Sequence, residues 1–245
     1  MNVPLTESQQ NPKMADSIAR QLVREILDLD LPIGKSLPNE KAMLETLGVA
    51  RPTLREALRL LESNGSIVMK TGRGGGPIVR KPRATDVGRL LSLLLEFEGM
   101  AVTEVFEARL LLEPILLHLA AERVSDDDLA RLEILLDEMG RSTEDSEAFS
   151  KAGEEFHNVA VAASGVPVLA IVEQALRSIS PAMSRTYTQE RRAESVESHR
   201  MILESIRSGN AVSAESGARA HLQAAITYCE LHITEFGDQR IEWVE

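Results

Sequence analysis

Three histidines in the second half of the chain are the strongest candidates for chemistry. His157, His199 and His221 lie in three different segments with helical periodicity, and each shares a helix face with apolar or small residues. These faces point the imidazoles into the interior, and the small neighbours leave room for a cavity. The three rings could converge on one divalent ion such as Zn, Ni or Mn, or they could be hydrogen-bonded core residues without a metal. The residues alone leave both interpretations open.

Arg109 is a second candidate in the same half. It lies among Val105, Leu112 and Leu116 on an apolar helix face, where a charge needs a partner. The carboxylate of a bound effector would serve, which makes Arg109 a candidate effector-binding residue. Glu113, one helical turn further on, could equally form an ion pair with it. Both interactions could occur if a ligand competes with Glu113 for the arginine.

A basic segment near the N-terminus could read DNA. Arg51, Thr53 and Arg55 open the helix predicted for residues 51–65, and the guanidinium fork of arginine can bond two acceptors on guanine at once. Lys41, at the start of the preceding helix, suits a phosphate contact as a point charge. The alternative is a solvated charged face, but the complete pattern of surrounding elements favours DNA binding.

A glycine-rich run, TGRGGG at residues 71–76, lies between two short β-prone segments. Arg73 and Gly74 would form the tip of a hairpin slim enough to approach the minor groove. A phosphate-binding loop is the alternative, but such a loop needs a lysine and a Ser or Thr opening a helix. Here the run leads into strand-like residues, which excludes that interpretation.

The elements that must position these DNA-binding residues follow from periodicity and turn signals. Helices are predicted near residues 13–29, 40–47 and 51–65, and a β-hairpin is predicted from strands at 66–69 and 77–80. On either side of the helix at 40–47, Asn39 is a possible N-cap and Gly48 ends the helix. Three helices and a hairpin predict a winged helix-turn-helix, in which the third helix enters the major groove.

The rest of the chain is helical by periodicity, and the fold class is therefore mainly α. We expect a tail at 1–12, the winged domain at 13–81, a linker at 82–86, an all-α antiparallel bundle at 87–235 and a tail at 236–245. Bundles of this kind form ligand sites between facing helices. The candidate helices of the bundle lie near 87–97, 101–123, 126–140, 144–164, 167–186, 190–208 and 211–235.

The distribution of charge supports the same division into a DNA-binding domain and a helical effector domain. The net charge is −11, but the first 83 residues hold 13 Lys and Arg against 9 Asp and Glu, whereas the remainder holds 14 against 29. An acidic surface is repelled by phosphate, so only the first domain is expected to touch DNA. The single cysteine, the lack of a secretory start and the short apolar runs predict a cytoplasmic protein with no membrane role.

Residues 34–79 resemble the DNA-binding domain of GntR-type regulators. Their sequence is GKSLPNEKAMLETLGVARPTLREALRLLESNGSIVMKTGRGGGPIV. The family pattern runs G-x-x-LP-S-E-R, LGVSR, REAL-x-x-L and a GRG wing. Three positions depart from it: Asn39 replaces serine, Lys41 replaces arginine, and Ala50 replaces serine or threonine. These departures concern helix capping and operator preference rather than the fold.

The second half resembles the FCD-type effector domain of the FadR-like branch of GntR regulators. The matching stretches are EARLLLEP, AAER, EFH, SHRMILESIRSGN and ARAHLQAA. The resemblance implies a divalent metal held by one aspartate and three histidines, with a small carboxylate as its ligand. The family aspartate lies four positions before the first histidine, where this chain has Gly153. Glu154 lies on the same face as His157 and could reach the metal instead, or water could fill the place.

The sequence therefore predicts a homodimeric repressor that binds a palindromic operator in double-stranded DNA and senses a small effector, most simply a carboxylate at a divalent metal. One alternative is a metal-free sensor of an acyl or other apolar ligand. Another is a metalloenzyme fused to a DNA-binding domain. No serine, cysteine or paired carboxylates mark a nucleophile or an acid/base pair in the predicted helices, so we expect no enzymatic activity.

Overall fold

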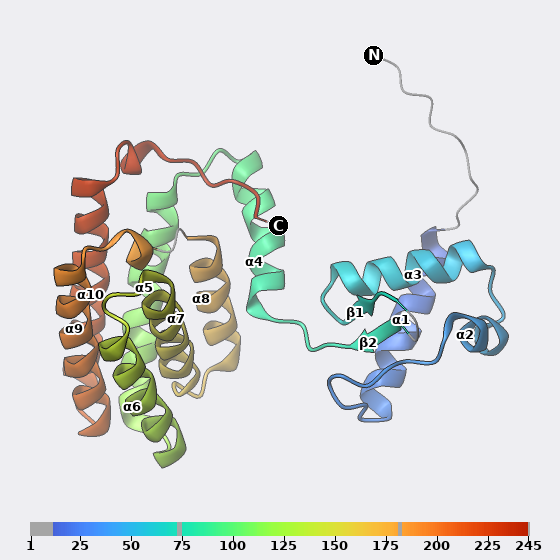
Figure 1. Cartoon of the computed structure of the whole chain (residues 1–245), viewed down its shortest axis with the longest axis horizontal. Helices are drawn as coiled ribbons and strands as arrows, with labels where there is room; N and C mark the ends of the chain where they lie inside the picture. Colours follow the sequence, from blue (N-terminus) through green and yellow to red (C-terminus); the bar gives the residue numbers. More distant parts are fainter. Residues whose placement is uncertain (1–11, 73–74, 181–182, 245) are drawn as a thin grey trace. The chain divides into compact units, whose positions relative to one another are not determined.

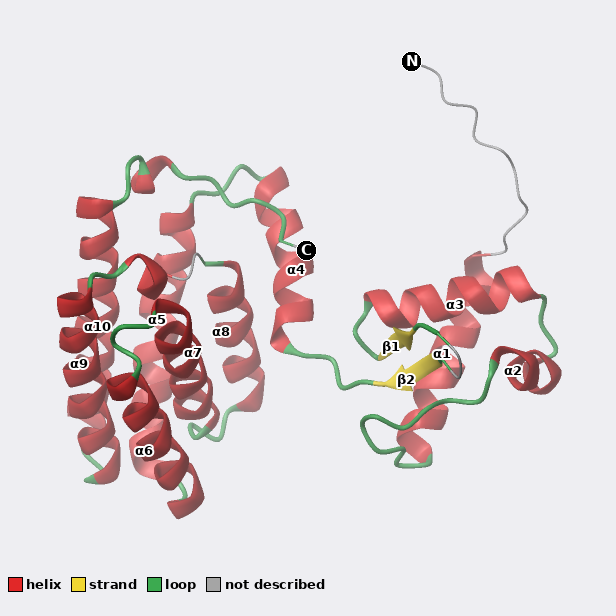
Figure 2. Cartoon of the chain, viewed as in Figure 1, coloured by secondary structure: helices red, strands yellow, loops and turns green. Residues whose placement is uncertain are grey.

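The computed structural model describes residues 12–72, 75–180 and 183–244. The chain divides into two compact units, residues 1–86 and 87–245, and each is described by itself. Helices dominate both units, and the two strands lie in the first (Figure 2). No helix in the described part of the chain is both long and apolar enough to cross a bilayer.

The N-terminal unit is the predicted winged helix. Three helices, α1 (Pro12–Asp28), α2 (Glu40–Leu47) and α3 (Arg51–Ser63), are followed by β1 (Ile67–Lys70) and β2 (Gly76–Val79) (Figure 1). The two strands are antiparallel, with Ile67 opposite Val79. Apolar faces of α1 and α3 pack with β1 into one core, whose buried residues are Ile18, Ala19, Leu22, Met43, Leu54, Ala57, Leu58, Leu61 and Ile67.

Local signals explain why the helix-turn-helix forms at these residues. The Asn39 side chain accepts a hydrogen bond from the Ala42 amide at 3.0 Å and so caps α2, as predicted. Gly48 ends that helix with φ of 65°, a left-handed conformation that glycine adopts without a steric penalty. Helix α3 begins after Ala50, which has no side-chain oxygen to cap it. The amide groups at the start of α3 therefore stay open to an outside acceptor.

The C-terminal unit is a bundle of seven α-helices in the described residues. Helix α5 is central, because it packs against α7, α8, α9 and α10. Its interior combines leucine, alanine and phenylalanine side chains with several buried charges. The helices are α4 (Ala84–Phe97), α5 (Val102–Arg123), α6 (Asp126–Arg141), α7 (Ser146–Ala162), α8 (Pro167–Ile179), α9 (Gln189–Arg207) and α10 (Ala211–His232).

The helix predicted at 167–186 ends earlier than expected. Helix α8 ends at Ile179, and a short 3-10 helix, Met183–Thr186, follows. The reason is Pro181, because the residue before a proline is forced out of the helical region. Ser180 accordingly has ψ of 140°. The break matters for the site, because it places Ser180 and Met183 along the wall of a cavity.

The boundaries of the bundle also differ from expectation at both ends. Helix α4 begins at Ala84, inside the predicted linker, because the Asp86 carboxylate accepts the Arg83 amide at 2.7 Å and stabilises the first turn. Residues 236–244 were predicted as part of a tail, yet Phe236 and Ile241 are buried. The Ile241 amide donates to the Met100 carbonyl at 3.0 Å, so this segment closes one end of the bundle.

Candidate metal and effector site

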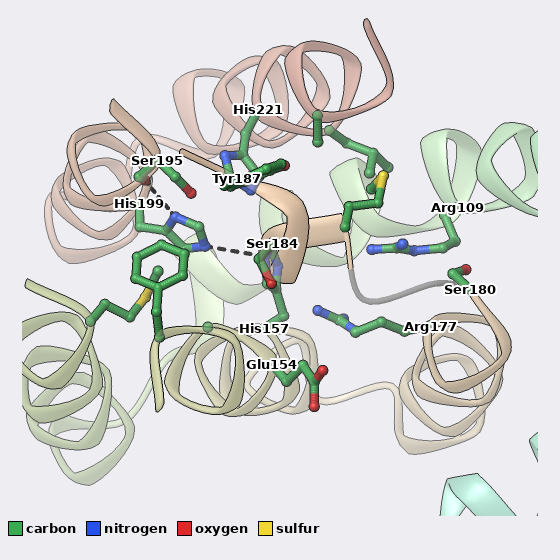
Figure 3. A pocket seen from close by; sticks show the side chains of 16 residues that line it. Arg109, Glu154, His157, Arg177, Ser180, Ser184, Tyr187, Ser195, His199 and His221 are labelled. Carbon is green, nitrogen blue, oxygen red and sulfur yellow. Dashed lines mark hydrogen bonds between the residues drawn. The ribbon is translucent and has the colours of Figure 1, made fainter. Parts of the chain in front are cut away.

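The structure brings the three predicted histidines together. His157 on α7, His199 on α9 and His221 on α10 each offer one ring nitrogen, and these atoms all lie within 4.8 Å of one another (Figure 3). The Nε2 atoms of His157 and His199 are 3.2 Å apart. Interior faces on three separate helices thus converge on one point, as the periodicity predicted.

Neighbouring groups orient two of the three rings. The Nδ1 of His199 donates to the Ser195 carbonyl at 2.7 Å, and the Nδ1 of His157 lies 2.6 Å from Oε1 of Glu113. The Nδ1 of His199 therefore carries the proton, and the Nε2 of the neutral ring carries a lone pair. At 3.2 Å, the Nε2 of His157 is close enough to share a proton or a metal ion with this lone pair. The donor set fits a divalent metal.

Burial keeps two of the three rings ready to bind a metal. It lowers the pKa of His199 to about 4 and the pKa of His221 well below its ordinary value. Both rings are therefore neutral near pH 7, which is the form that coordinates metal ions. The Nδ1 of His221 is buried and has no hydrogen-bond partner among the described residues. A ligand or ion at this point would satisfy a nitrogen that is otherwise unpaired.

The carboxylate expected beside the histidines is not there. Glu154 is exposed, its Oε1 accepts a hydrogen bond from Ser150 Oγ at 3.4 Å, and its carboxylate is not part of the three-histidine cluster. One turn before His157, Gly153 leaves open space. A Cβ at this position would meet only the Met139 side chain, with its Cε at 3.4 Å. The metal position would therefore be open to water or to a ligand oxygen on this side.

Next to the histidines lies a buried charge cluster formed by α5 and α8. Nη2 of Arg109 is 3.2 Å from Glu113, and its Nε is 3.6 Å from Glu173. The ion pair with Glu113 was one of the two alternatives for Arg109, and the structure contains it. Arg177 contacts Glu173 through Nη2. All four side chains are at least nine-tenths buried.

The two glutamates respond oppositely to burial. Burial raises the pKa of Glu113, but the Arg177 and Arg109 guanidiniums outweigh this effect and hold the pKa below its ordinary value. Burial and the neighbouring Glu113 carboxylate raise the pKa of Glu173 well above its ordinary value. Sequence analysis singled out neither Glu173 nor Arg177. A signal existed, because they are the only charged residues of α8, one helical turn apart in an otherwise apolar helix.

A cavity of about 90 Å³ joins the histidines to the arginines. Roughly 10–15 Å³ is enough for one water molecule, so the cavity has room for a small ligand. Its lining is strongly polar for an interior, which favours a charged ligand. The polar residues along it are Arg109, Glu154, His157, Arg177, Ser180, Ser184, Tyr187, Ser195, His199 and His221 (Figure 3).

The predicted DNA-binding residues lie at the N-terminal end of α3 and on α2. Arg51 is the first residue of α3, is exposed and has no ion pair within the described chain. Arg55 is exposed but lies 3.5 Å from Glu40, and Lys41 lies 3.9 Å from Glu45. Thr53 is partly buried. Arg73 and Gly74 lie outside the described residues.

Comparison with known proteins places both units. Residues 14–75 match the family described as bacterial regulatory proteins, gntR family, and residues 104–224 match the FCD domain. The Streptococcus agalactiae GntR structure aligns with a TM-score of 0.62 at 28% sequence identity, covering 86% of this chain and 98% of that one.

Similar sequences carry regulatory names. The HTH-type transcriptional regulator YcbG of Bacillus subtilis is 29% identical over 84% of this chain and 88% of its own length. The galactonate operon transcriptional repressor of Escherichia coli is 29% identical over 83% and 91%. The transcriptional repressor NanR of Enterobacter sp. is 26% identical over 86% and 84%. These relatives and families consist of regulators rather than enzymes.

Proposed function

Because this chain belongs to the gntR family of bacterial regulatory proteins and carries an FCD domain, it is a DNA-binding transcriptional regulator, and we propose that it is a carboxylate-responsive repressor. In this proposal the winged helix binds an operator, and a small carboxylate binds at a divalent metal in the helical bundle. The metal would be Zn, Ni or Mn, held by His157, His199 and His221. It would supply a positive charge with open positions for ligand oxygens.

The DNA-binding half of the proposal rests on the exposed start of α3. Arg51 and Arg55 would read base edges there, with Thr53 beside them, while Lys41 would meet phosphate. Arg73 and Gly74 would serve as the wing tip. These residues are proposed on the motif and on the exposure of the described ones.

We further propose a homodimer acting in the cytoplasm, because one winged helix reads only a short half-site and two copies would read a palindrome. One exposed apolar stripe supports the dimer. On α4, large side chains recur every three to four residues and would be covered by a second copy of the chain. They are Val87, Leu90, Leu94 and Phe97.

The proposed binding of an effector rests on one observation, the cavity that is lined by three histidines and two arginines. A carboxylate suits such a lining, because it can accept from a guanidinium and can bind a metal ion. An acyl or other apolar ligand would leave these buried polar groups unpaired. Among the relatives is a repressor named for the galactonate operon, and galactonate is a small carboxylate.

The test is a coupled binding experiment on the full chain. Operator DNA is first selected from a random library, and its affinity is then measured by fluorescence anisotropy with metal and with added carboxylates. An effector should change operator affinity by about 5–150-fold, and operator DNA should change effector affinity by the same factor. Selection without any sequence preference would contradict the proposal, as would carboxylate binding that leaves operator affinity unchanged.

The proposed metal site makes a further prediction at Gly153. The substitution Gly153→Asp places a carboxylate one turn before His157, where only the Met139 side chain is close. A fourth protein ligand should tighten binding of Zn²⁺ by at least about tenfold, or 1.4 kcal/mol, in a competition titration with a chelator.

Gly153→Ala is the matched control, because it removes the same glycine without adding an oxygen. It should stabilise α7 by roughly 0.5–1 kcal/mol while leaving metal affinity unchanged. Native mass spectrometry would report the metal and the number of chains together. A wild-type protein that holds no divalent ion and gains no thermal stability from Zn, Ni or Mn would refute the metal site.

A further inference from the structure

The C-terminal segment, residues 239–244, lies against α4 and the turn that follows this helix (Figure 1). The Val102 amide donates to the Gln239 carbonyl at 2.8 Å, and the Ile241 amide donates to the Met100 carbonyl at 3.0 Å. These two hydrogen bonds pair the segment with the start of α5 in a short antiparallel bridge. The chain then continues along α4.

Two further hydrogen bonds attach the C-terminal segment to α4 itself. The Trp243 amide donates to Oε2 of Glu96 at 2.8 Å, and the Val244 amide donates to Oγ of Ser92 at 3.2 Å. Ser92 and Glu96 are about one helical turn apart, so the segment follows the helix for a turn. Ser92 is completely buried, and Val244 packs against the hydrophobic core of the bundle. The segment therefore covers one side of α4.

Helix α4 contributes few buried side chains of its own to the bundle. Its buried residues are Gly88 and Ser92, and neither carries a large apolar side chain. Leu91 and Leu95 pack against the core but stay partly exposed. Helix α5, by contrast, is buried at ten of its positions. Burial of apolar surface is the main favourable term in packing, so the C-terminal segment supplies a large share of what holds α4 in place.

The position of α4 matters because the winged helix precedes it directly in the chain. Strand β2 ends at Val79 and α4 begins at Ala84, so residues 80–83 alone separate them. The exposed apolar stripe proposed as the dimer face also lies on α4. Ser92 and Glu96 lie on the opposite side of the helix from this stripe, because an α-helix repeats every 3.6 residues. The C-terminal segment can therefore hold α4 without covering the stripe.

We propose that the C-terminal segment fixes α4 against the bundle and thereby limits the movement of the two winged helices in the dimer. A dimer binds a palindrome tightly because binding of one winged helix raises the effective concentration of the other at the second half-site. This gain depends on how stiffly the two are connected. Release of the segment lets α4 move, so the gain becomes smaller. The inference rests on the proposed homodimer and is independent of the effector.

The test weakens the attachment from the α4 side and leaves the sequence of the C-terminal segment unchanged. The double variant Ser92→Ala, Glu96→Ala removes both side-chain acceptors. Hydrogen–deuterium exchange in the segment and in α4 should become about tenfold faster, the effect of two lost hydrogen bonds. In anisotropy titrations, affinity for the selected palindrome should fall by at least about fivefold. Affinity for DNA with one intact and one scrambled half-site should not change.

Glu98→Ala is the matched control, because Glu98 is exposed two positions beyond Glu96 and its loss changes the charge equally. It should alter neither exchange nor DNA binding. A second variant, Ile241→Asp, releases the C-terminal segment from its own side, because Ile241 is 3% exposed and a charge is costly there. It should weaken palindrome binding in the same way and keep the helical circular dichroism spectrum of wild type.

The outcomes separate this inference from the homodimer on which it rests. Faster exchange with an unchanged preference for palindrome over half-site DNA would overturn the role of the C-terminal segment in DNA binding. Faster exchange in the segment but not in α4 would show that the segment does not hold the helix. A wild-type protein that is monomeric in native mass spectrometry and binds both DNAs equally would refute the homodimer, and the inference with it.

Discussion

Replacing Arg109 with methionine should lower the free energy of unfolding of the helical unit by about 3–5 kcal/mol. The substitution removes the guanidinium 3.2 Å from Glu113, which is 1% exposed, while Glu173 keeps its contact with Arg177. A buried carboxylate that loses its partner must become protonated or be left uncompensated, and either change destabilises the fold.

The single tryptophan gives a convenient measurement. Trp243 lies in the C-terminal unit, is 54% exposed, and is attached to α4 by a hydrogen bond from its backbone amide to Glu96 at 2.8 Å, so its fluorescence in denaturant is compared with the loss of helical circular dichroism. Arg141→Met is the control, because Arg141 and Asp137 form an exposed ion pair at 77% and 70% exposure. Such a pair contributes roughly 0–1 kcal/mol. A loss below about 1 kcal/mol in Arg109→Met would show that the buried cluster contributes little to stability.

The second large effect is expected at the DNA surface. Arg51→Ala should weaken binding of the selected operator by roughly 1–3 kcal/mol and relax the preference at one base position. Arg51 is exposed at the start of α3 and has no ion pair within the described chain, so its guanidinium is free to reach a base edge. Arg55→Ala should have a smaller effect, because Arg55 must first leave Glu40, which lies 3.5 Å away.

Lys41→Ala provides the contrast for this measurement. A phosphate contact carries no sequence information, so this variant should weaken operator and random DNA alike and reduce the salt dependence of binding. Anisotropy titrations at several salt concentrations would compare the three variants. If Arg51→Ala loses affinity equally on both DNAs, Arg51 contacts the backbone rather than a base.

Much of the fold could be predicted from local signals. The helical periodicity around Leu54 and Leu58, the cap at Asn39 and the glycine at position 48 each depend on residues only a few positions apart. The inward placement of His199 and His221 followed from the same periodicity, because a helix face is set by spacing alone. These features therefore needed no tertiary structure.

The sequence predictions failed where the structure depended on a contact between distant parts of the chain or on the interruption of a helix. The helix expected through residue 186 ends at Ile179, shortly before Pro181. Proline is a local signal for a helix end, but the sequence prediction gave more weight to the helical periodicity. The burial of Phe236 depended on the Phe106 ring, 5.8 Å away and 130 positions earlier in the chain. Glu154 shares a helix with His157, yet its exposed carboxylate takes no part in the histidine cluster.

The sequence by itself determined a winged helix, a helical bundle and three inward-facing histidines, because each depends on short-range spacing and turn chemistry. Only the tertiary structure decided which charges meet. Glu113 on α5 lies 2.6 Å from the Nδ1 of His157 on α7, and Arg109 on α5 reaches Glu173 on α8. These contacts depend on how each helix is rotated and shifted against its neighbours, and no spacing along the chain encodes that. The same packing buried Arg177 along the cavity of the histidines, a residue that the sequence patterns had not singled out.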